Sequence, residues 1–120
     1  MNQVDFINGK TRVFGIVGDP IEQVRSPEMV TWEFHQRPYN AVMIPIHIAQ
    51  SDFDHVIPEI MQIRNLDGLI FTIPYKVKAL GLAKNLGQQA SLVRAINAIK
   101  RQSHGDWSGE IFDGLGCVEA

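Results

Sequence analysis

The sequence alternates short apolar runs with segments of helical apolar spacing, and this alternation constrains the fold more than any other feature. Residues 11–18, 40–48 and 66–74 are apolar runs of strand length, and each is followed by a segment with apolar residues three and four positions apart. Strands and helices in that order predict right-handed βαβ crossovers. We therefore predict a three-layer α/β domain with a mainly parallel sheet flanked by helices.

Two features of the runs predict where strands lie in the sheet. Pro45 cannot donate a ladder hydrogen bond, so the strand over residues 40–48 should lie at a sheet edge. The run over 66–74 is continuously apolar and should be a central strand with both faces covered. Residues 95–101 and 107–113 are separated by a short turn and should pair as a C-terminal antiparallel hairpin.

The expected helices follow from caps and apolar spacing. Ser26 offers a capping hydroxyl before Pro27, which suits a first helical position, and this helix should end near residues 37–38. A second helix should begin at residues 51–54. Further helices are expected over 75–86, with Val77, Leu80, Leu82 and Leu86 facing inward, and over 88–93, and Trp32 and Phe34 are expected in the core.

Composition narrows the class of protein. The chain has 120 residues, 45% of them hydrophobic, which fits one domain with its own core. Its formal charge is −2 and its basic residues are scattered, which argues against nucleic acid and anionic membranes as partners. No apolar run approaches the roughly 18 residues of a membrane span, and a single cysteine cannot form an internal disulfide. A cytoplasmic protein is expected.

The candidate chemistry lies in loops that follow the strands. In a parallel sheet these loops share one edge, where ligands usually bind, and here they hold residues 19–26, 72–76, Asn97 and Asp113. A lysine just beyond a buried strand, Lys76, and an aspartate ending another can form an ion pair that exchanges a proton with a bound hydroxyl. The alternative is that Lys76 is a solvated lysine in the first turn of a helix.

The same segments resemble the N-terminal, substrate-binding domain of the shikimate dehydrogenase family over nearly the whole chain. Four stretches carry the resemblance: GIVGDPI with Arg25-Ser26-Pro27, FTIPYK over residues 71–76, AINA over 95–98, and Asp113-Gly114. The resemblance implies an NAD(P)-linked interconversion of a ring alcohol and its ketone, of the shikimate and 3-dehydroshikimate type, in the shikimate pathway of aromatic amino acid biosynthesis.

The resemblance also implies a role for each matched residue. Lys76 would move the hydroxyl proton, and Asp113 would hold that lysine and the same hydroxyl. Asn97 would hydrogen-bond a ring hydroxyl. Ser26 and Thr72 would face the substrate carboxylate with neutral donors.

The chain departs from the family pattern at polar positions. Val24 stands where the family usually has a serine, Ile70 where it has an asparagine, and Ile111-Phe112 where it has a polar pair. We expect Val24, Ile70 and Tyr75 to line the substrate site. These replacements favour a less polar ring acid over shikimate, and they leave open a second hypothesis, a non-catalytic binding or regulatory module that keeps the fold.

The resemblance divides the protein into parts. Residues 1–113 would form the substrate-binding catalytic domain, and residues 114–120 would start a helix toward a nucleotide-binding domain that this chain lacks. NADP or NAD would bind there, so the chain alone should hold no cofactor and be inactive. Gly114-Leu115-Gly116 lacks the third glycine of a dinucleotide motif. The four histidines lie in different expected elements, so no metal site is predicted, and the exposed sheet edge is compatible with a homodimer.

Overall fold

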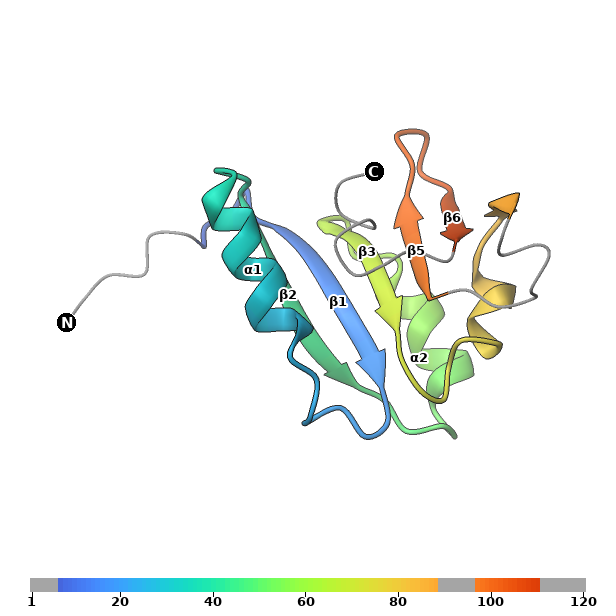
Figure 1. Ribbon diagram of the computed structural model, residues 1–120. Coiled ribbons are helices and arrows are strands. Elements are labelled where there is room, and N and C mark those ends of the chain that lie inside the picture. The colour runs from blue at the N-terminus through green and yellow to red at the C-terminus, as the bar shows by residue number, and fades with distance from the viewer. Residues whose placement is uncertain (1–6, 89–96, 111–120) are drawn as a thin grey trace.

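The computed structural model describes residues 7–88 and 97–110, which form a six-stranded sheet between helices (Figure 1). The first half alternates strand and helix as expected, and the C-terminal part adds a hairpin. The elements are β1 (Arg12–Gly18), α1 (Ser26–Gln36), β2 (Ala41–His47), α2 (Phe53–Ile60), β3 (Leu66–Phe71), the 3₁₀ helix η1 (Lys78–Leu82), β4 (Asn85–Leu86), β5 (Ala98–Arg101) and β6 (Trp107–Glu110).

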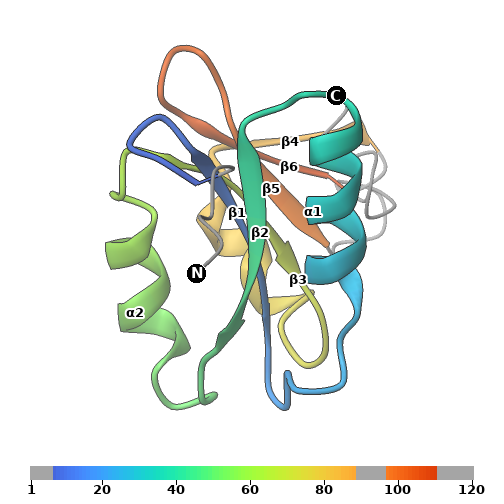
Figure 2. The ribbon, with the colours of Figure 1, turned by 90° about the vertical axis from the view of Figure 1, so that its left-hand side faces the viewer.

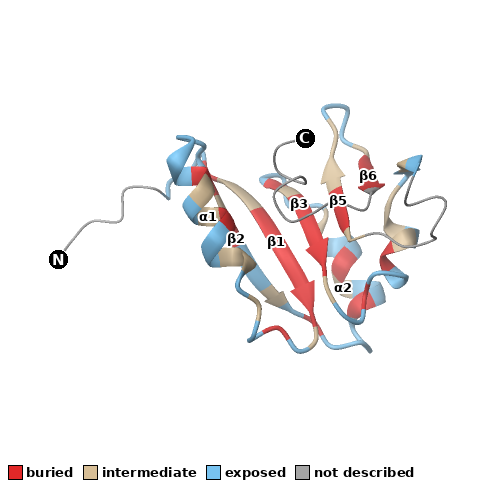
Figure 3. Ribbon diagram, in the orientation of Figure 1, coloured by how far each residue is buried: buried red, intermediate tan, exposed pale blue. Residues whose placement is uncertain are grey.

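The strand order is β2-β1-β3-β5-β6-β4. β1 pairs in parallel with both β2 and β3, whereas β5 runs antiparallel to β3 and to β6. The predicted α/β class and the antiparallel C-terminal pair are therefore confirmed. Pro45 lies on an edge strand and β3 is central and buried along most of its length, both as predicted (Figure 3).

The outer edge of β2 is partly closed. Arg12 N donates to Asn40 O at 2.9 Å, so in the parallel ladder the odd-numbered residues of β2 point their amides away from β1. Of these, Met43 N donates to Thr31 Oγ1 at 2.9 Å, and Pro45 has no N–H to offer. The predicted sheet edge exists, but these two positions offer no free amide for pairing with another strand.

Two apolar clusters fill the space on the two faces of the sheet, with α1 and α2 on opposite sides (Figure 2). The cluster under α2 and η1 includes Phe53, Leu69 and Tyr75. The cluster under α1 includes Phe14 and Phe34, whose rings lie 5.3 Å apart. Phe34 is a core residue as predicted. The same prediction for Trp32 is wrong, because this residue is 59% exposed.

The helix predicted over residues 75–86 is also wrong. Only the short η1 forms, and Val77, predicted to face inward, is exposed while Ala79 is fully buried. The chain after η1 is drawn into the sheet instead, because Lys84 N donates to Trp107 O at 2.9 Å and β4 pairs with β6. Tertiary pairing therefore overrides the helical apolar spacing. The helix predicted over 88–93 lies almost wholly outside the described residues.

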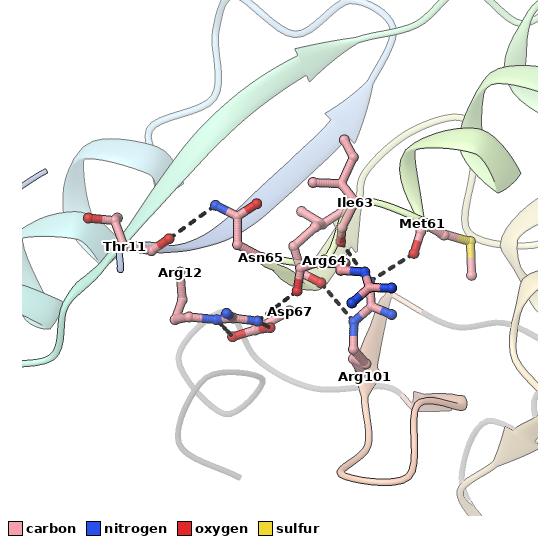
Figure 4. A network of polar contacts seen from close by, with 9 residues as sticks. Thr11, Arg12, Met61, Ile63, Arg64, Asn65, Asp67 and Arg101 are labelled. Carbon is pink, nitrogen blue, oxygen red and sulfur yellow. Dashed lines mark hydrogen bonds and ion pairs between the residues drawn. The ribbon is translucent and has the colours of Figure 1, made fainter. Parts of the chain in front are cut away.

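A polar network joins the edge of the sheet where β1 and β3 begin and β5 ends (Figure 4). Arg101 donates to the backbone oxygens of Met61, Ile63 and Leu66 at 2.8, 2.9 and 3.0 Å. Arg12 forms an ion pair with Asp67 at 2.6 Å. Arg101 thus holds the segment between α2 and β3 in a non-helical path, and α2 ends at Ile60. None of the described helices has the length and apolar content to cross a membrane.

Candidate functional site

The predicted site segments lie at the edge of the sheet formed by the carboxyl ends of β1, β2 and β3, opposite the network of Arg12 and Arg101. β1, β2 and β3 are parallel, so their carboxyl ends share this edge. β5 is antiparallel to β3, so Asn97 at its amino end lies on the same edge, and so does the carboxyl end of β6. Figure 1 shows these loops below the sheet, away from the β5–β6 turn. Sequence-distant segments therefore meet at one edge, as predicted.

Backbone hydrogen bonds fix these segments against one another. They join neighbouring strand ends along the whole edge from β2 to β5. The bonds run from Ile48 N to Gly18 O at 3.4 Å, from Asp19 N to Ile73 O at 3.3 Å, from Thr72 N to Val17 O at 2.9 Å, and from Phe71 N to Asn97 O at 2.7 Å. The positions of the loop residues are therefore set by the sheet itself, which favours a preformed ligand site.

Gly18 allows the side chain of Thr72 to lie close to β1. A Cβ on Gly18 would stand 2.4 Å from Thr72 Cγ2 and 3.4 Å from Ile73 O, so only glycine leaves room for the threonine methyl group. Thr72 is partly buried by this contact. Its side chain is thus held at the end of β3 by a neighbouring strand.

Ser26 is the first residue of α1 and is partly buried. The expectation that its hydroxyl caps the helix is wrong, because Arg25 occupies the N-cap position and no side chain caps the helix there. Pro27 follows at the start of the helix, as predicted. The first turn of α1 therefore begins at the same edge as Thr72, with a serine at its start.

Lys76 lies exposed in the turn between β3 and η1. Tyr75 N donates to Thr72 O at 2.9 Å, which closes this turn just before the lysine. Asn97 is partly buried at the start of β5. Asp113 lies outside the described residues, so its pairing with Lys76 stays a prediction.

Tyr75 takes a different place from the one expected of a ligand contact. Its side chain is 1% exposed and its ring stacks on Phe53 with centroids 4.3 Å apart. Its hydroxyl donates a short hydrogen bond to Ile48 O. Burial raises the pKa of Tyr75, and the carboxylates of Asp19 and Asp52 raise it further. The side chain is a core residue that supports the Lys76 turn, and its predicted contact with substrate stays a prediction.

Val24 and Ile70 lie in the same apolar region. Ile70 belongs to the buried cluster under α1, together with Ile21, and Val24 packs against that cluster. Both stand where the sequence departs from the family pattern, and in the structure they adjoin one apolar cluster instead of being isolated substitutions. Ile111 and Phe112 lie outside the described residues.

A contact between a histidine and a carboxylate at this edge escaped the sequence analysis. His47 Nε2 lies 2.7 Å from Asp19 Oδ1, and the side chains are 53% and 30% exposed. His47 ends β2 opposite Gly18 in the parallel register, which places it beside Asp19. The only sequence signal was that both residues stand where an apolar run ends.

The described residues do not form a dinucleotide cradle. The three turns that lead from strand to helix, over residues 19–25, 48–52 and 72–77, contain no glycine. Gly18 precedes the first of them, but the space beside its Cα is filled by Thr72. Within the described residues no three histidine, cysteine or acidic side chains gather as metal ligands.

Comparison with known proteins identifies the family. The sequence-family model described as the shikimate dehydrogenase substrate binding domain matches residues 16–99 of this chain. A shikimate dehydrogenase (NADP(+)) of Microcystis aeruginosa is 35% identical over 89% of this chain and 37% of its own length, and one of Methanobrevibacter smithii is 28% identical over 95% and 39%. A Listeria monocytogenes shikimate 5-dehydrogenase, solved in complex with shikimate and NAD, matches with a TM-score of 0.84 and 25% identity, covering 98% of this chain and 40% of its own. This chain spans about two fifths of these proteins, and it belongs to the family of shikimate dehydrogenase substrate-binding domains.

Proposed function

We propose that this chain binds the ring acid of an NADP-dependent alcohol dehydrogenase of the shikimate dehydrogenase type. The observation that carries the proposal is that the segments of Ser26, Thr72, Lys76 and Asn97 lie along one edge of the sheet, where backbone hydrogen bonds join the strand ends. These four residues come from three separate segments of the chain and supply hydroxyl, ammonium and amide groups. Such a set suits a small molecule that carries both a carboxylate and hydroxyl groups.

Each side chain has a distinct proposed role. Ser26 and Thr72 donate hydrogen bonds to the substrate carboxylate, and Asn97 binds a ring hydroxyl. Lys76 takes up or returns the proton of the hydroxyl that is oxidised, with Asp113 as its orienting partner. A nicotinamide cofactor supplies the hydride chemistry when it is bound. The described residues bind and orient the acid and handle the proton.

The cofactor belongs to another part of the enzyme in this proposal. Residues 1–113 form the substrate-binding domain, and residues 114–120 lead toward a nucleotide-binding domain. The names of the curated relatives support NADP as the cofactor. We further propose a cytoplasmic enzyme that acts in aromatic amino acid biosynthesis. If the protein forms a homodimer, side chains must supply most of the contact, because Thr31 and Pro45 close part of the β2 edge.

The preferred acid is proposed to be less polar than shikimate. Val24 and Ile70 present apolar side chains at positions where the family pattern has hydrogen-bonding groups. A substrate hydroxyl left without a partner there would cost about 1 to 3 kcal/mol of binding free energy. Ring acids that lack a hydroxyl on that side should therefore bind more tightly than shikimate.

NMR titration of the chain with shikimate, quinate and less hydroxylated ring acids tests the proposal. Binding should shift the amide signals of residues 72–76 and Asn97, and Ser26→Ala with Thr72→Val should weaken it about tenfold or more through the loss of two donors. Ser103→Ala, in the exposed turn between β5 and β6, is the matched control and should bind as the wild type does. A chain that binds none of these acids at millimolar concentration refutes the proposal.

A further inference from the structure

We propose that the Asp19–His47 pair sets the charge beside the carboxylate end of the substrate site, so that protonation of His47 favours acids over neutral analogues. This inference rests on the proposed function, because it assumes that an acid binds near Ser26 and Thr72. It assigns a role in specificity to two residues for which the family resemblance implies no role. Neither residue would have to touch the substrate.

The geometry fixes the pair next to the Thr72–Lys76 turn. His47 Nε2 lies 2.7 Å from Asp19 Oδ1. The backbone of Asp19 is tied to that turn, because Asp19 N donates to Ile73 O at 3.3 Å. Gly18, one residue earlier, lies against the methyl group of Thr72. Chain geometry therefore places the Asp19 carboxylate within about 10 Å of the Thr72 hydroxyl.

At that separation the charge of Asp19 acts on a bound acid. About 10 Å is one Debye length at moderate salt, so screening is incomplete. Ser26 and Thr72 are neutral donors and bring no positive charge to offset the aspartate. When His47 is protonated, its imidazolium cancels the Asp19 charge. When His47 is neutral, the aspartate repels an anion bound at the same edge.

Other titratable groups also lie near this edge. Burial, followed by Asp19 and Asp52, raises the pKa of Tyr75, so the tyrosine stays neutral. Asp52 is itself 3.6 Å from His55 at the start of α2. Lys76 stands exposed in the adjacent turn. His47 is the titratable group in direct contact with Asp19.

The test compares shikimate with its methyl ester, which has the same ring but no charge. Dissociation constants are measured by NMR titration at about pH 5.5 and pH 8, between which a histidine normally titrates while a carboxyl group stays ionised. For wild type, shikimate should bind about three- to tenfold more tightly at the lower pH. The methyl ester should show no such dependence.

Variants separate the electrostatic role from a structural one. His47→Gln should abolish the pH dependence and hold shikimate at its weaker affinity. Asp19→Asn should raise shikimate affinity at the higher pH about three- to tenfold. His55→Gln removes a comparable exposed histidine from the Asp52 pair and is the matched control, with wild-type pH dependence expected. Thermal unfolding confirms that each variant is folded, and Asp19→Asn keeps the test valid if His47→Gln does not fold.

The outcomes distinguish the two proposals. Wild-type protein that binds neither ligand refutes the proposed function and this inference with it. If shikimate binds but His47→Gln keeps the wild-type pH dependence, or Asp19→Asn weakens shikimate at the higher pH, only the charge role is overturned. Equal losses for shikimate and its methyl ester would show that the pair merely shapes the loop, which also overturns it.

Discussion

The hydroxyl of Tyr75 donates a hydrogen bond to the backbone oxygen of Ile48, and this contact joins the turn after β3 to the end of β2. The same ring stacks on Phe53 from α2. Lys76 follows Tyr75 directly in the chain, so the proposed catalytic lysine extends from a residue that is held in the core. The stability of this anchor can be measured in the chain without any ligand.

Tyr75→Phe keeps the ring stack and removes the hydroxyl. The variant should lose about 1 to 3 kcal/mol of unfolding free energy, because Ile48 O is left without its partner. Urea denaturation measures the change. Tyr39→Phe is a control at a tyrosine that is 39% exposed and should change stability less. A Tyr75→Phe protein as stable as wild type would show that the hydrogen bond contributes nothing net.

Alkaline pH should weaken the same anchor. Burial, followed by Asp19 and Asp52, raises the pKa of Tyr75 above its ordinary value of 10.0. The folded state therefore holds the phenol proton more tightly than the unfolded state. The resulting stability is fully present below about pH 10 and is lost as pH rises through the folded-state pKa. Urea denaturation from about pH 8 to pH 11 should show a smaller decline for Tyr75→Phe than for wild type. Equal declines in stability for Tyr75→Phe and wild type would contradict the role of Tyr75 in this pH dependence. Tyr39, whose pKa burial and Asp67 also raise, accounts for part of the remaining slope.

Gly18→Ala tests how closely Thr72 is packed against β1. The new Cβ would stand 2.4 Å from Thr72 Cγ2, so the threonine must move, at a cost of about 1 to 3 kcal/mol of unfolding free energy and with weaker binding of ring acids. Gly81→Ala is the control, because a Cβ there meets no atom within 4 Å. Thr72→Ser removes the clashing methyl group and keeps the hydroxyl. Combined with Gly18→Ala, it should restore much of the stability in thermal and urea denaturation, and failure of this rescue would place the strain elsewhere.

Arg101→Met should destabilise the opposite edge of the sheet. The substitution removes the donors to Met61 O, Ile63 O and Leu66 O and the contact of the guanidinium with Trp107, 4.6 Å from the ring centroid. A loss of about 2 to 4 kcal/mol in unfolding free energy is expected. Lys100→Met, at the neighbouring position in β5, should cost much less. Similar losses for both variants in urea denaturation would mean that strand β5, and not the network, is responsible.

The sequence predicted best those features that one residue determines locally. Pro45 cannot donate a ladder bond and lies on an edge strand, and the predicted short turn forms between β5 and β6, where Gly105 has a φ of 96°. The helix over 75–86 failed because the end of that segment, β4, pairs with β6, which is more than twenty residues away. The core prediction for Trp32 failed because this apolar residue, which periodicity assigns to the core, lies on the exposed side of α1.

The predictions about the candidate site also differ in how much they depend on pairing between distant strands. Thr72, Lys76 and Asn97 were predicted to meet because the carboxyl ends of parallel strands share an edge, and the pairing of β1, β3 and β5 brings their segments together. The Asp19–His47 pair depends on the register between β1 and β2, which no pattern in the sequence encodes. Tyr75 was predicted to line the substrate site, and the structure places its side chain in the core under α2.

Lys76→Ala tests the proposed proton transfer in a protein that includes a nucleotide-binding domain, such as a fusion to that domain of a relative. Turnover with NADP and a ring alcohol should fall about a hundredfold or more, since general acid and base groups typically contribute that much. Binding of the acid should change little, because Ser26 and Thr72 hold its carboxylate. Lys78→Ala is the matched control, because that lysine pairs with Asp54 on α2. An unchanged kcat in Lys76→Ala would remove the lysine from the mechanism, whereas a rise in KM alone would reassign it to substrate binding.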